Sequence, residues 1–226
     1  MSVTLKKTDS GLQQAVLQEL KWDTRVEETE VGVEVDSGVV TLTGTVSSWA
    51  KRQAAQEAAH RVSGVLDVAN DIQVRIPGSG TRSDTDIARA VRQALEWNVF
   101  VPETRIQSTV SEGWVTLTGD VEYWSHREDA ESAIRYLTGV RGVSNLIEVK
   151  APKLNSSDIR KTIEAALERQ AEREAGRIGL DLRDGRVNLT GTVHSWAEKE
   201  AVLGAVRGTP GVRTVESHLV IEPFRT

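Results

Sequence analysis

Hydrophobic positions along the chain follow one order of spacings, and that order occurs three times. Each copy opens with apolar residues at i, i+4 and i+8, the spacing of one helix face. Two short stretches of alternating apolar and polar residues follow, a pattern typical of half-buried strands. A second helical stripe and a last alternating stretch complete each copy. The opening stripes are Leu12/Val16/Leu20, Ile87/Val91/Leu95 and Ile159/Ile163/Leu167.

A short turn separates the first two alternating stretches of each copy. In the first copy, 31–35 and 40–44 alternate on either side of Asp36-Ser-Gly38. A glycine-containing turn between two alternating stretches predicts a β-hairpin. The equivalent turns are Ser111-Glu-Gly113 and Asp184-Gly185.

Glycines and tryptophans keep the three copies in one register. Each second strand carries a glycine, a tryptophan stands five residues later, and another glycine stands twenty residues later. Because the copies align without a gap, we interpret them as an internal repeat. We expect the glycines to be structural, allowing a close approach or bulge in the strand and ending the second helix, although a binding groove at the strand glycines is an alternative. The residues are Gly44, Gly119 and Gly191, then Trp49, Trp124 and Trp196, then Gly64, Gly139 and Gly211.

The repeat predicts an α+β fold of three tandem α-β-β-α-β units. Each unit should be a small three-stranded mixed sheet covered on one face by two helices, with a right-handed crossover between its second and third strands. Ser125-His-Arg-Glu128 and Ser195-Trp-Ala-Glu198 have capping-box spacing, so we expect second helices to begin there. The expected organisation is a flexible N-terminus (1–10), a first domain (11–76), a linker (77–82), a second domain (83–149), a linker (150–155) and a third domain (156–222).

Composition excludes several classes of protein. The 226 residues include 28 Lys+Arg and 33 Asp+Glu, a net charge of −5, which argues against a general nucleic-acid binder. The absence of cysteine excludes disulfides and thiolate metal sites. No apolar run approaches the roughly 18 residues of a transmembrane segment. The first amphipathic stretch carries Glu19 and lacks the features of a signal peptide, so we expect a cytoplasmic protein as written, or a periplasmic one if a leader was removed.

The motif V-x-L-x-G-x-V, then a helix, then G-V-x-x-V-x-N-x-[IL]-x-V, resembles the BON domain of bacterial osmotically induced proteins. The first copy carries the motif in 40–46 and 64–74, and the second in 115–121 and 139–149. The third copy departs from it at Ser217, where the motif has asparagine. The resemblance implies no catalytic role, and an association with phospholipid surfaces, envelope integrity, osmotic stress or cation sensing.

Five tryptophans are candidate surface-binding residues. An indole combines an apolar body with one donor, which suits a membrane interface or a protein contact. Trp49, Trp124 and Trp196 start the second helices, where each could instead cap its own core or pack on a neighbouring copy. Trp22 and Trp97 end the first helices of two copies. Arg169 replaces them in the third, which favours a surface or interdomain contact over a role in the fold.

No residue pattern indicates catalysis or metal binding. The four histidines stand at unrelated positions in the repeat, and no acidic pair recurs in all three copies. Nucleophile-elbow, phosphate-loop and dinucleotide-binding motifs are absent. We therefore expect no catalytic residue, no metal and no cofactor.

The sequence favours a non-enzymatic BON-repeat protein that engages phospholipid or protein surfaces, in an osmotic or envelope stress response. One alternative is a cytosolic potassium or calcium sensor that uses acidic turns and strand-end carbonyls. Another is a structural or chaperone-like protein with no discrete ligand. The oligomeric state is left open.

Overall fold

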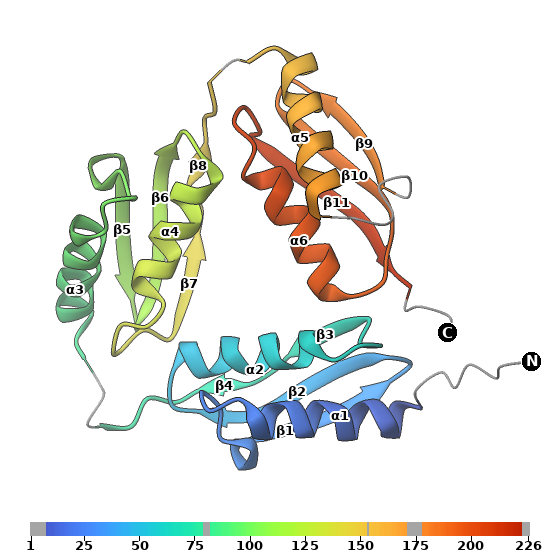
Figure 1. The fold of residues 1–226 in the computed structure, drawn as a ribbon. Helices are drawn as coiled ribbons and strands as arrows, with labels where there is room; N and C mark the ends of the chain where they lie inside the picture. Colours follow the sequence, from blue (N-terminus) through green and yellow to red (C-terminus); the bar gives the residue numbers. More distant parts are fainter. Residues whose placement is uncertain (1–7, 79–81, 153, 171–177, 223–226) are drawn as a thin grey trace, which may run out of the picture. The chain divides into compact units, whose positions relative to one another are not determined.

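The computed structural model describes residues 8–78, 82–152, 154–170 and 178–222. Its helices and strands form three α+β units, and each unit has its own mixed sheet (Figure 1). This confirms the predicted fold class. The first helix begins at Asp9, two residues before the expected start of the first domain, while 1–7 lie outside the described residues. The domain boundaries remain a prediction.

Unit 1 has a central strand that pairs with both of its neighbours. Strand β2 is antiparallel to β1 and parallel to β3 and β4, and α2 links the parallel strands. The elements are α1 (Asp9–Trp22), the short 3-10 helix η1 (Glu28–Glu30), β1 (Val31–Asp36), β2 (Val39–Val46), α2 (Trp49–Arg61), β3 (Asp67–Asn70) and β4 (Gln73–Val74).

Units 2 and 3 repeat this arrangement, with one difference in the last strand. Unit 2 contains α3 (Asp84–Trp97), η3 (Glu103–Arg105), β5 (Ile106–Ser111), β6 (Trp114–Val121), α4 (Trp124–Ile134), β7 (Gly142–Asn145) and β8 (Glu148–Val149). Unit 3 contains α5 (Ser156–Gln170), β9 (Ile178–Arg183), β10 (Arg186–Val193), α6 (Trp196–Arg207) and β11 (Thr214–Ile221). The last strand is interrupted in units 1 and 2 and continuous in unit 3. Within the described parts of the chain, no helix has both the length and the apolar composition to cross a membrane.

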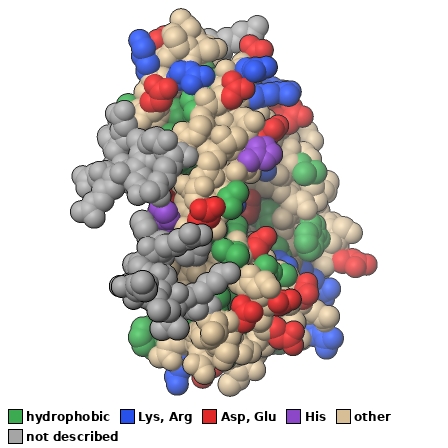
Figure 2. Space-filling view, turned by 90° about the vertical axis from the view of Figure 1, so that its right-hand side faces the viewer, with side chains coloured by type: hydrophobic (Ala, Val, Ile, Leu, Met, Phe, Trp, Pro, Cys, Tyr) green, Lys and Arg blue, Asp and Glu red, His purple; other side chains and the backbone are tan. Residues whose placement is uncertain are grey.

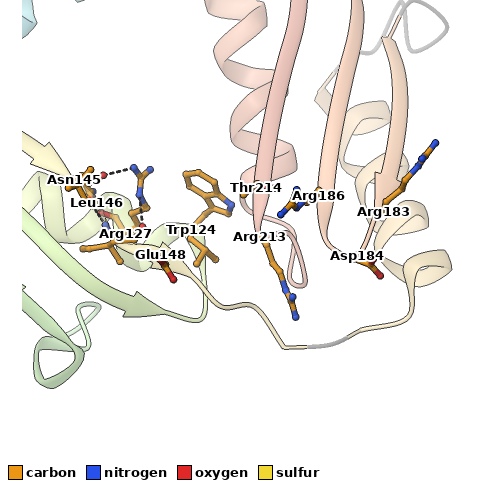
Figure 3. Close-up of a pocket in the computed structure, with 12 residues that line it drawn as sticks. Trp124, Arg127, Asn145, Leu146, Glu148, Arg183, Asp184, Arg186, Arg213 and Thr214 are labelled. Carbon is orange, nitrogen blue, oxygen red and sulfur yellow. Dashed lines mark hydrogen bonds between the residues drawn. The ribbon is translucent and has the colours of Figure 1, made fainter.

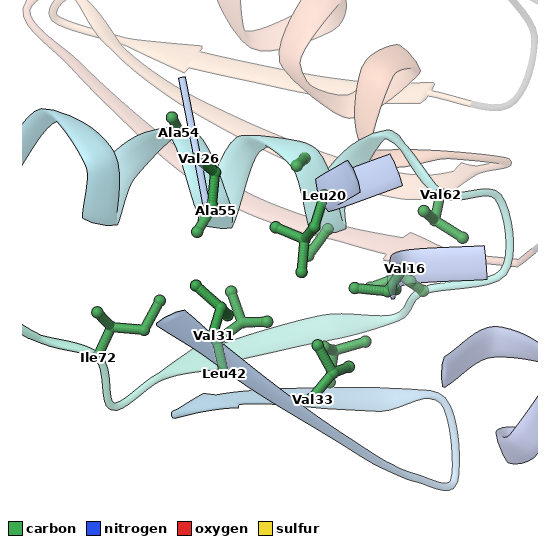
Figure 4. Close-up of a cluster of buried hydrophobic side chains, with 14 of the residues drawn as sticks. Val16, Leu20, Val26, Val31, Val33, Leu42, Ala54, Ala55, Val62 and Ile72 are labelled. Carbon is green, nitrogen blue, oxygen red and sulfur yellow. The ribbon is translucent and has the colours of Figure 1, made fainter. Parts of the chain in front are cut away.

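The core of unit 1 lies between its helices and one face of its sheet. Leu12, Val16 and Leu20 form the predicted stripe of α1 and are buried. They belong to the same cluster as Val33 and Leu42 from the strands (Figure 4). Helix α2 contributes mainly alanines to this cluster, and such small side chains allow a helix to lie close to a sheet.

The hairpin turns place two consecutive residues in the left-handed region. In unit 1 these are Ser37 (φ 52°) and Gly38 (φ 82°), and in unit 2 they are Glu112 (φ 51°) and Gly113 (φ 79°). Positive φ at both central positions is characteristic of a type I′ turn, whose twist matches that of the flanking strands. The predicted hairpins are therefore present with a two-residue connection.

A carboxylate at the start of the first helix holds each of the first two hairpin turns. The Ser37 and Gly38 amides donate to the two carboxylate oxygens of Asp9, at 2.9 and 3.0 Å. Asp84 accepts from the turn amides at 112 and 113, at 2.9 Å each. These bonds connect the N-terminus of the first helix to the tip of the hairpin.

Backbone conformation explains the glycine in each second strand. The φ angles are 118° at Gly44, 125° at Gly119 and 122° at Gly191, where other residues are strained. A Cβ on Gly44 would also overlap the carbonyl oxygen of Glu30, and one on Gly119 would overlap that of Arg105. This close approach supports a structural role for these glycines.

The glycines after the second helices face the first helix of the same unit. A Cβ on Gly64 would lie 3.0 Å from a methyl of Leu12, and one on Gly211 would lie 2.7 Å from a methyl of Ile159. Their φ angles, 101° and 92°, also favour glycine. Gly139 has the same conformation, with φ 99°.

One of the two expected capping boxes is wrong. Ser195 caps α6, since its Oγ accepts from the Glu198 amide at 3.1 Å. Helix α4 instead begins at Trp124, after Tyr123, which makes no side-chain capping bond. Ser125 therefore lies inside the helix, because Tyr123 is the residue in register with Ser195.

We predict that Gly44→Ala lowers the free energy of unfolding of unit 1 by about 2–4 kcal/mol, because alanine is strained at this φ and its methyl would collide with backbone. Gly11→Ala, in α1 of the same unit, is the control. It should raise stability by up to about 1 kcal/mol, since Gly11 has helical backbone. Urea denaturation with hydrogen exchange of the β1 and β2 amides would measure both. Equal effects of the two variants would contradict the structural role.

Candidate binding surfaces

The described residues show no metal centre. No group of three or more histidine or acidic side chains within them is placed to hold a metal ion. The tryptophans are the remaining candidates for a binding surface.

The tryptophans of the second helices each lie against a cation from one helical turn later. The distances from the cation to the ring centroid are 4.9 Å for Arg52 and Trp49, 5.0 Å for Arg127 and Trp124, and 4.6 Å for Lys199 and Trp196. Such contacts contribute about 0.5–1 kcal/mol at exposed sites and more where the ring is buried, as it is at Trp49.

In units 1 and 2 the arginine also binds the interruption in the last strand. Arg127 donates through Nε to the Ile147 carbonyl at 3.1 Å, and through a terminal nitrogen to the Asn145 carbonyl at 2.7 Å (Figure 3). The Asn145 side chain donates back to the Arg127 carbonyl at 2.8 Å. Burial lowers the pKa of the Arg127 guanidinium, whose donors these carbonyls satisfy. Trp124 thus supports a structural link between helix and strand.

Unit 1 contains the same link, and unit 3 has lost it. Arg52 donates to the carbonyls of Ile72 and Asn70, at 3.1 and 2.5 Å. Unit 3 has Lys199 and Ser217 at the two linked positions, and its last strand is continuous. A lysine ammonium lacks the planar fork with which arginine bridges two carbonyls. Unit 3 therefore lacks both the arginine–asparagine pair and the interruption of the last strand.

This link bears on the cation-sensor hypothesis, which requires free strand-end carbonyls. In unit 2 the carbonyls at 145 and 147 already accept bonds from a guanidinium, and those at 70 and 72 do so in unit 1. No feature of the described residues favours a cation at these places.

Trp22 and Trp97 differ from the other three, because they are mostly exposed. The exposed fraction is 71% for Trp22 and 79% for Trp97, at the ends of α1 and α3. Both side chains therefore lie on the surface, and their role in binding stays a prediction. Their surroundings differ between the two units.

In unit 1 the residue that follows Trp22, Asp23, belongs to a network of ion pairs. Asp23 accepts from Arg25 at 2.8 and 2.9 Å and from Arg61 at 2.8 Å. Arg61 also binds Glu19 at 2.7 Å, and Arg25 binds Glu57 at 2.9 Å. Hydrogen bonds from Arg25, and then from Arg61, hold the pKa of Asp23 well below its usual range, although burial opposes them.

Unit 2 replaces these charges with apolar and neutral residues. The equivalents of Glu19, Asp23, Arg25, Glu57 and Arg61 are Ala94, Asn98, Phe100, Ser132 and Tyr136. We call Trp97, Val99, Phe100 and Tyr136 the aromatic corner. Their exposed fractions are 79%, 88%, 68% and 65%.

A fixed turn presents the aromatic corner. The Asn98 side chain accepts from the Phe100 amide at 3.0 Å, and the Asn98 carbonyl accepts from the Val101 amide at 3.0 Å. Val101 is buried, which anchors the far end of the turn. Val99 and Phe100 are thus held outward by their neighbours.

Trp97 was predicted from its place in the repeat, but Val99, Phe100 and Tyr136 were not. Hydrophobic spacing does not reveal them, since they lie outside the core stripes. A comparison of charged positions between copies could have found them, because unit 2 loses all five charges of the unit 1 corner. In unit 3 the positions that correspond to Trp97, Asn98 and Phe100 are Arg169, Gln170 and Glu172, and their side chains lie outside the described ones.

Comparisons with known proteins identify relatives of the repeat. The pattern of the BON domain family matches residues 8–76, 83–151 and 155–223. Osmotically-inducible protein Y of Escherichia coli (strain K12) is 29% identical over 146 residues, which cover 63% of this chain and 73% of that protein. Two structures of CdsD, a structural protein of the type III secretion system of Chlamydia trachomatis, share 14% identity at a TM-score of 0.26. They cover 93% and 94% of this chain and 92% and 98% of theirs, but so low a score supports no inference.

We predict that Asp23→Asn lowers the free energy of unfolding of unit 1 by about 1–3 kcal/mol at neutral pH, because charged hydrogen bonds are lost. The lowered pKa means that this stabilisation is complete above the ordinary pKa of 3.8 and is lost as pH falls below it. The variant should therefore show a weaker decline in stability on acidification. Denaturation of unit 1 across acidic pH would measure this.

The matched control is Asn98→Asp in unit 2, where Phe100 and Tyr136 replace the two arginines. It should add no stability at neutral pH. A stabilising effect there would show that the arginines do not account for the behaviour of Asp23.

Proposed function

The chain belongs to the BON-domain family, and on this basis we propose that it is a non-enzymatic binding protein of an osmotic or envelope stress response. The family match extends over almost the whole chain. The stress response is suggested by the likeness to osmotically-inducible protein Y. A cytoplasmic location, or a periplasmic one after removal of a leader, remains our expectation.

The aromatic corner carries the proposal that the protein engages a surface. Large apolar side chains that are mostly exposed and lie together indicate an interaction site more often than isolated ones do. Tryptophan and tyrosine are enriched where a protein meets the membrane interface, since their rings are apolar and their tips polar. We therefore favour a phospholipid surface, and keep a protein surface as the other outcome.

Charge sets the kind of binding to expect. Residues 83–149 contain 6 basic and 11 acidic residues, which gives 6 − 11 = −5 for unit 2. Figure 2 shows another face of the molecule, on which acidic and basic side chains are interspersed, so the charge of unit 2 is taken from its sequence. Attraction to anionic lipids should therefore be weak, and binding should depend little on salt.

The expected affinity is modest. Complete burial of one large apolar side chain is favourable by about 1.5–3 kcal/mol. Because the aromatic corner would insert only partly into the membrane, each of its residues should contribute only a fraction of that free energy. A total of a few kcal/mol gives reversible binding that requires abundant lipid.

The alternative functions have less support. A potassium or calcium sensor remains a prediction, but the strand-end carbonyls it requires are bound by arginine in units 1 and 2. Among the residues that the structure describes, no specific contact favours a structural or chaperone-like role.

Flotation with vesicles tests the proposal. The full chain should float with phosphatidylcholine vesicles, and adding phosphatidylglycerol should increase binding little. Trp97→Ala combined with Phe100→Ala should abolish most flotation, and the blue shift of tryptophan fluorescence should shrink. Trp22→Ala is the matched control, since Trp22 has the same place in an ionic corner. It should have a much smaller effect.

Failure of the wild-type chain to float with either vesicle, with unchanged fluorescence, would rule out the lipid version. A protein surface would then be the remaining binding hypothesis. Full flotation of the double variant would show that the aromatic corner is not the site.

A further inference from the structure

The first strand of each unit is an edge strand. Strand β5 pairs with β6 on one side and, among the described residues, with no strand on the other (Figure 1). The same holds for β1 and β9. An edge strand exposes a row of backbone donors and acceptors that can pair with another strand, unless the protein blocks it.

The register of the hairpin identifies the outward groups of β5. Ser111 and Trp114 flank the two-residue turn and so form a hydrogen-bonded pair. Bonded and non-bonded pairs alternate along an antiparallel ladder. The backbone groups of Ile106, Ser108 and Val110 therefore point away from β6.

Units 1 and 3 block the equivalent edge with a side chain from the first helix. Gln13 donates to the Val33 carbonyl at 2.7 Å, and Arg160 donates to the Leu180 carbonyl at 3.1 Å. Gln13 and Arg160 occupy the same position in the repeat.

Unit 2 lacks this block. Ala88 stands where units 1 and 3 have Gln13 and Arg160, and it has no donor to offer. The Ser108 carbonyl corresponds to those of Val33 and Leu180, and no hydrogen bond reaches it from the part of the chain that the structure describes.

The side chains of the three edge strands also make pairing easier for β5 than for β1 or β9. Glu34 in β1 and Asp181 in β9 place a charge where β5 has Thr109. Charges on an edge discourage pairing with another strand, as do proline and bulges. Strand β5 reads Ile-Gln-Ser-Thr-Val-Ser, without charge, proline or glycine. Two independent features therefore leave this edge open.

We propose that β5 is the interface with a second copy of this chain, through antiparallel pairing of the two β5 strands about a twofold axis at Ser108. Such an interface is isologous: both copies use the same strand, and every contact occurs twice, once in each direction. The two sheets then form one continuous sheet across the dimer.

The strand is complementary to its own reverse, which is why a second copy fits it. Pairing about Ser108 sets Ile106 opposite Val110 and Gln107 opposite Thr109. Each pair joins side chains of the same kind, β-branched aliphatic with β-branched aliphatic and polar with polar, and no like charges meet. The same pairing of β1 would bring two copies of Glu34 near each other and displace Gln13 from Val33.

The dimer should be weak, because one strand from each copy buries little surface. Interfaces below about 1,200 Å² in total are typical of transient complexes. We expect a dissociation constant of roughly 10–100 µM.

Sedimentation equilibrium of the full chain over micromolar to near-millimolar concentrations tests the proposal. Ala88→Gln combined with Thr109→Glu gives unit 2 the edge residues of unit 1, and should weaken the dimer at least tenfold. Ala88→Ser combined with Thr109→Ser keeps the edge neutral and is the matched control. It should change the dissociation constant by no more than about twofold. Circular dichroism would show that both variants are folded.

The absence of cysteine allows a site-specific check. In Ser108→Cys, the two new thiols meet at the proposed axis, so mild oxidation should give a disulfide-linked dimer. Thr43→Cys, on an exposed position of β2 in unit 1, should not form one. A chain that is monomeric throughout, or a dimer that the charged edge variant leaves unchanged, would overturn the proposal. The vesicle-binding double variant should still dimerise, so the two proposals can fail separately.

Discussion

Units 1 and 2 depend on one close backbone contact, which occurs where the central strand passes the start of the first strand. At Gly44 and Gly119 the chain comes so near a preceding carbonyl that no side chain fits, and φ is positive there. This contact sets where the hairpin begins. The hairpin in turn places its tip against the carboxylate at the start of the first helix. The second helix then starts five residues after the glycine with a tryptophan that supports a cation. A substitution at this glycine would therefore disturb the whole unit.

The three units show how a conserved backbone can carry different surfaces. Positions that determine the core and the turns are occupied alike, because packing tolerates few changes there. Surface positions are free to differ, and they do so in groups. The corner beside the first helix is ionic in unit 1 and aromatic in unit 2. The edge of the sheet is blocked by Gln13 in unit 1 and by Arg160 in unit 3, but Ala88 leaves it open in unit 2. Unit 2 therefore concentrates the two features from which we infer binding and self-association.

Hydrophobic spacing predicted the helices, the strands and their order, because burial on one face imposes a period that survives in a single sequence. It failed where a local polar contact decided the outcome. The last strand was expected to be continuous in all units, yet Arg127 and Asn145 hold it apart in unit 2. Ser125 had the spacing of a cap, but the helix begins one residue before it. These features depend on which side chains meet across elements, and spacing along the chain does not contain that information.

The sequence by itself determined the repeat, the α+β class and the likeness to BON domains. Each follows from glycines and apolar residues that recur at set intervals. It also placed Trp22 and Trp97 among the candidate surface residues. Only the tertiary structure separated those two from Trp49 and Trp124, because exposure depends on what packs around a side chain. Only the structure revealed that Gln13 reaches the edge of a strand twenty residues away, and that the equivalent edge in unit 2 has no such donor. Hydrogen bonds between distant segments form only when folding brings those segments together, so their presence or absence is a property of the folded unit.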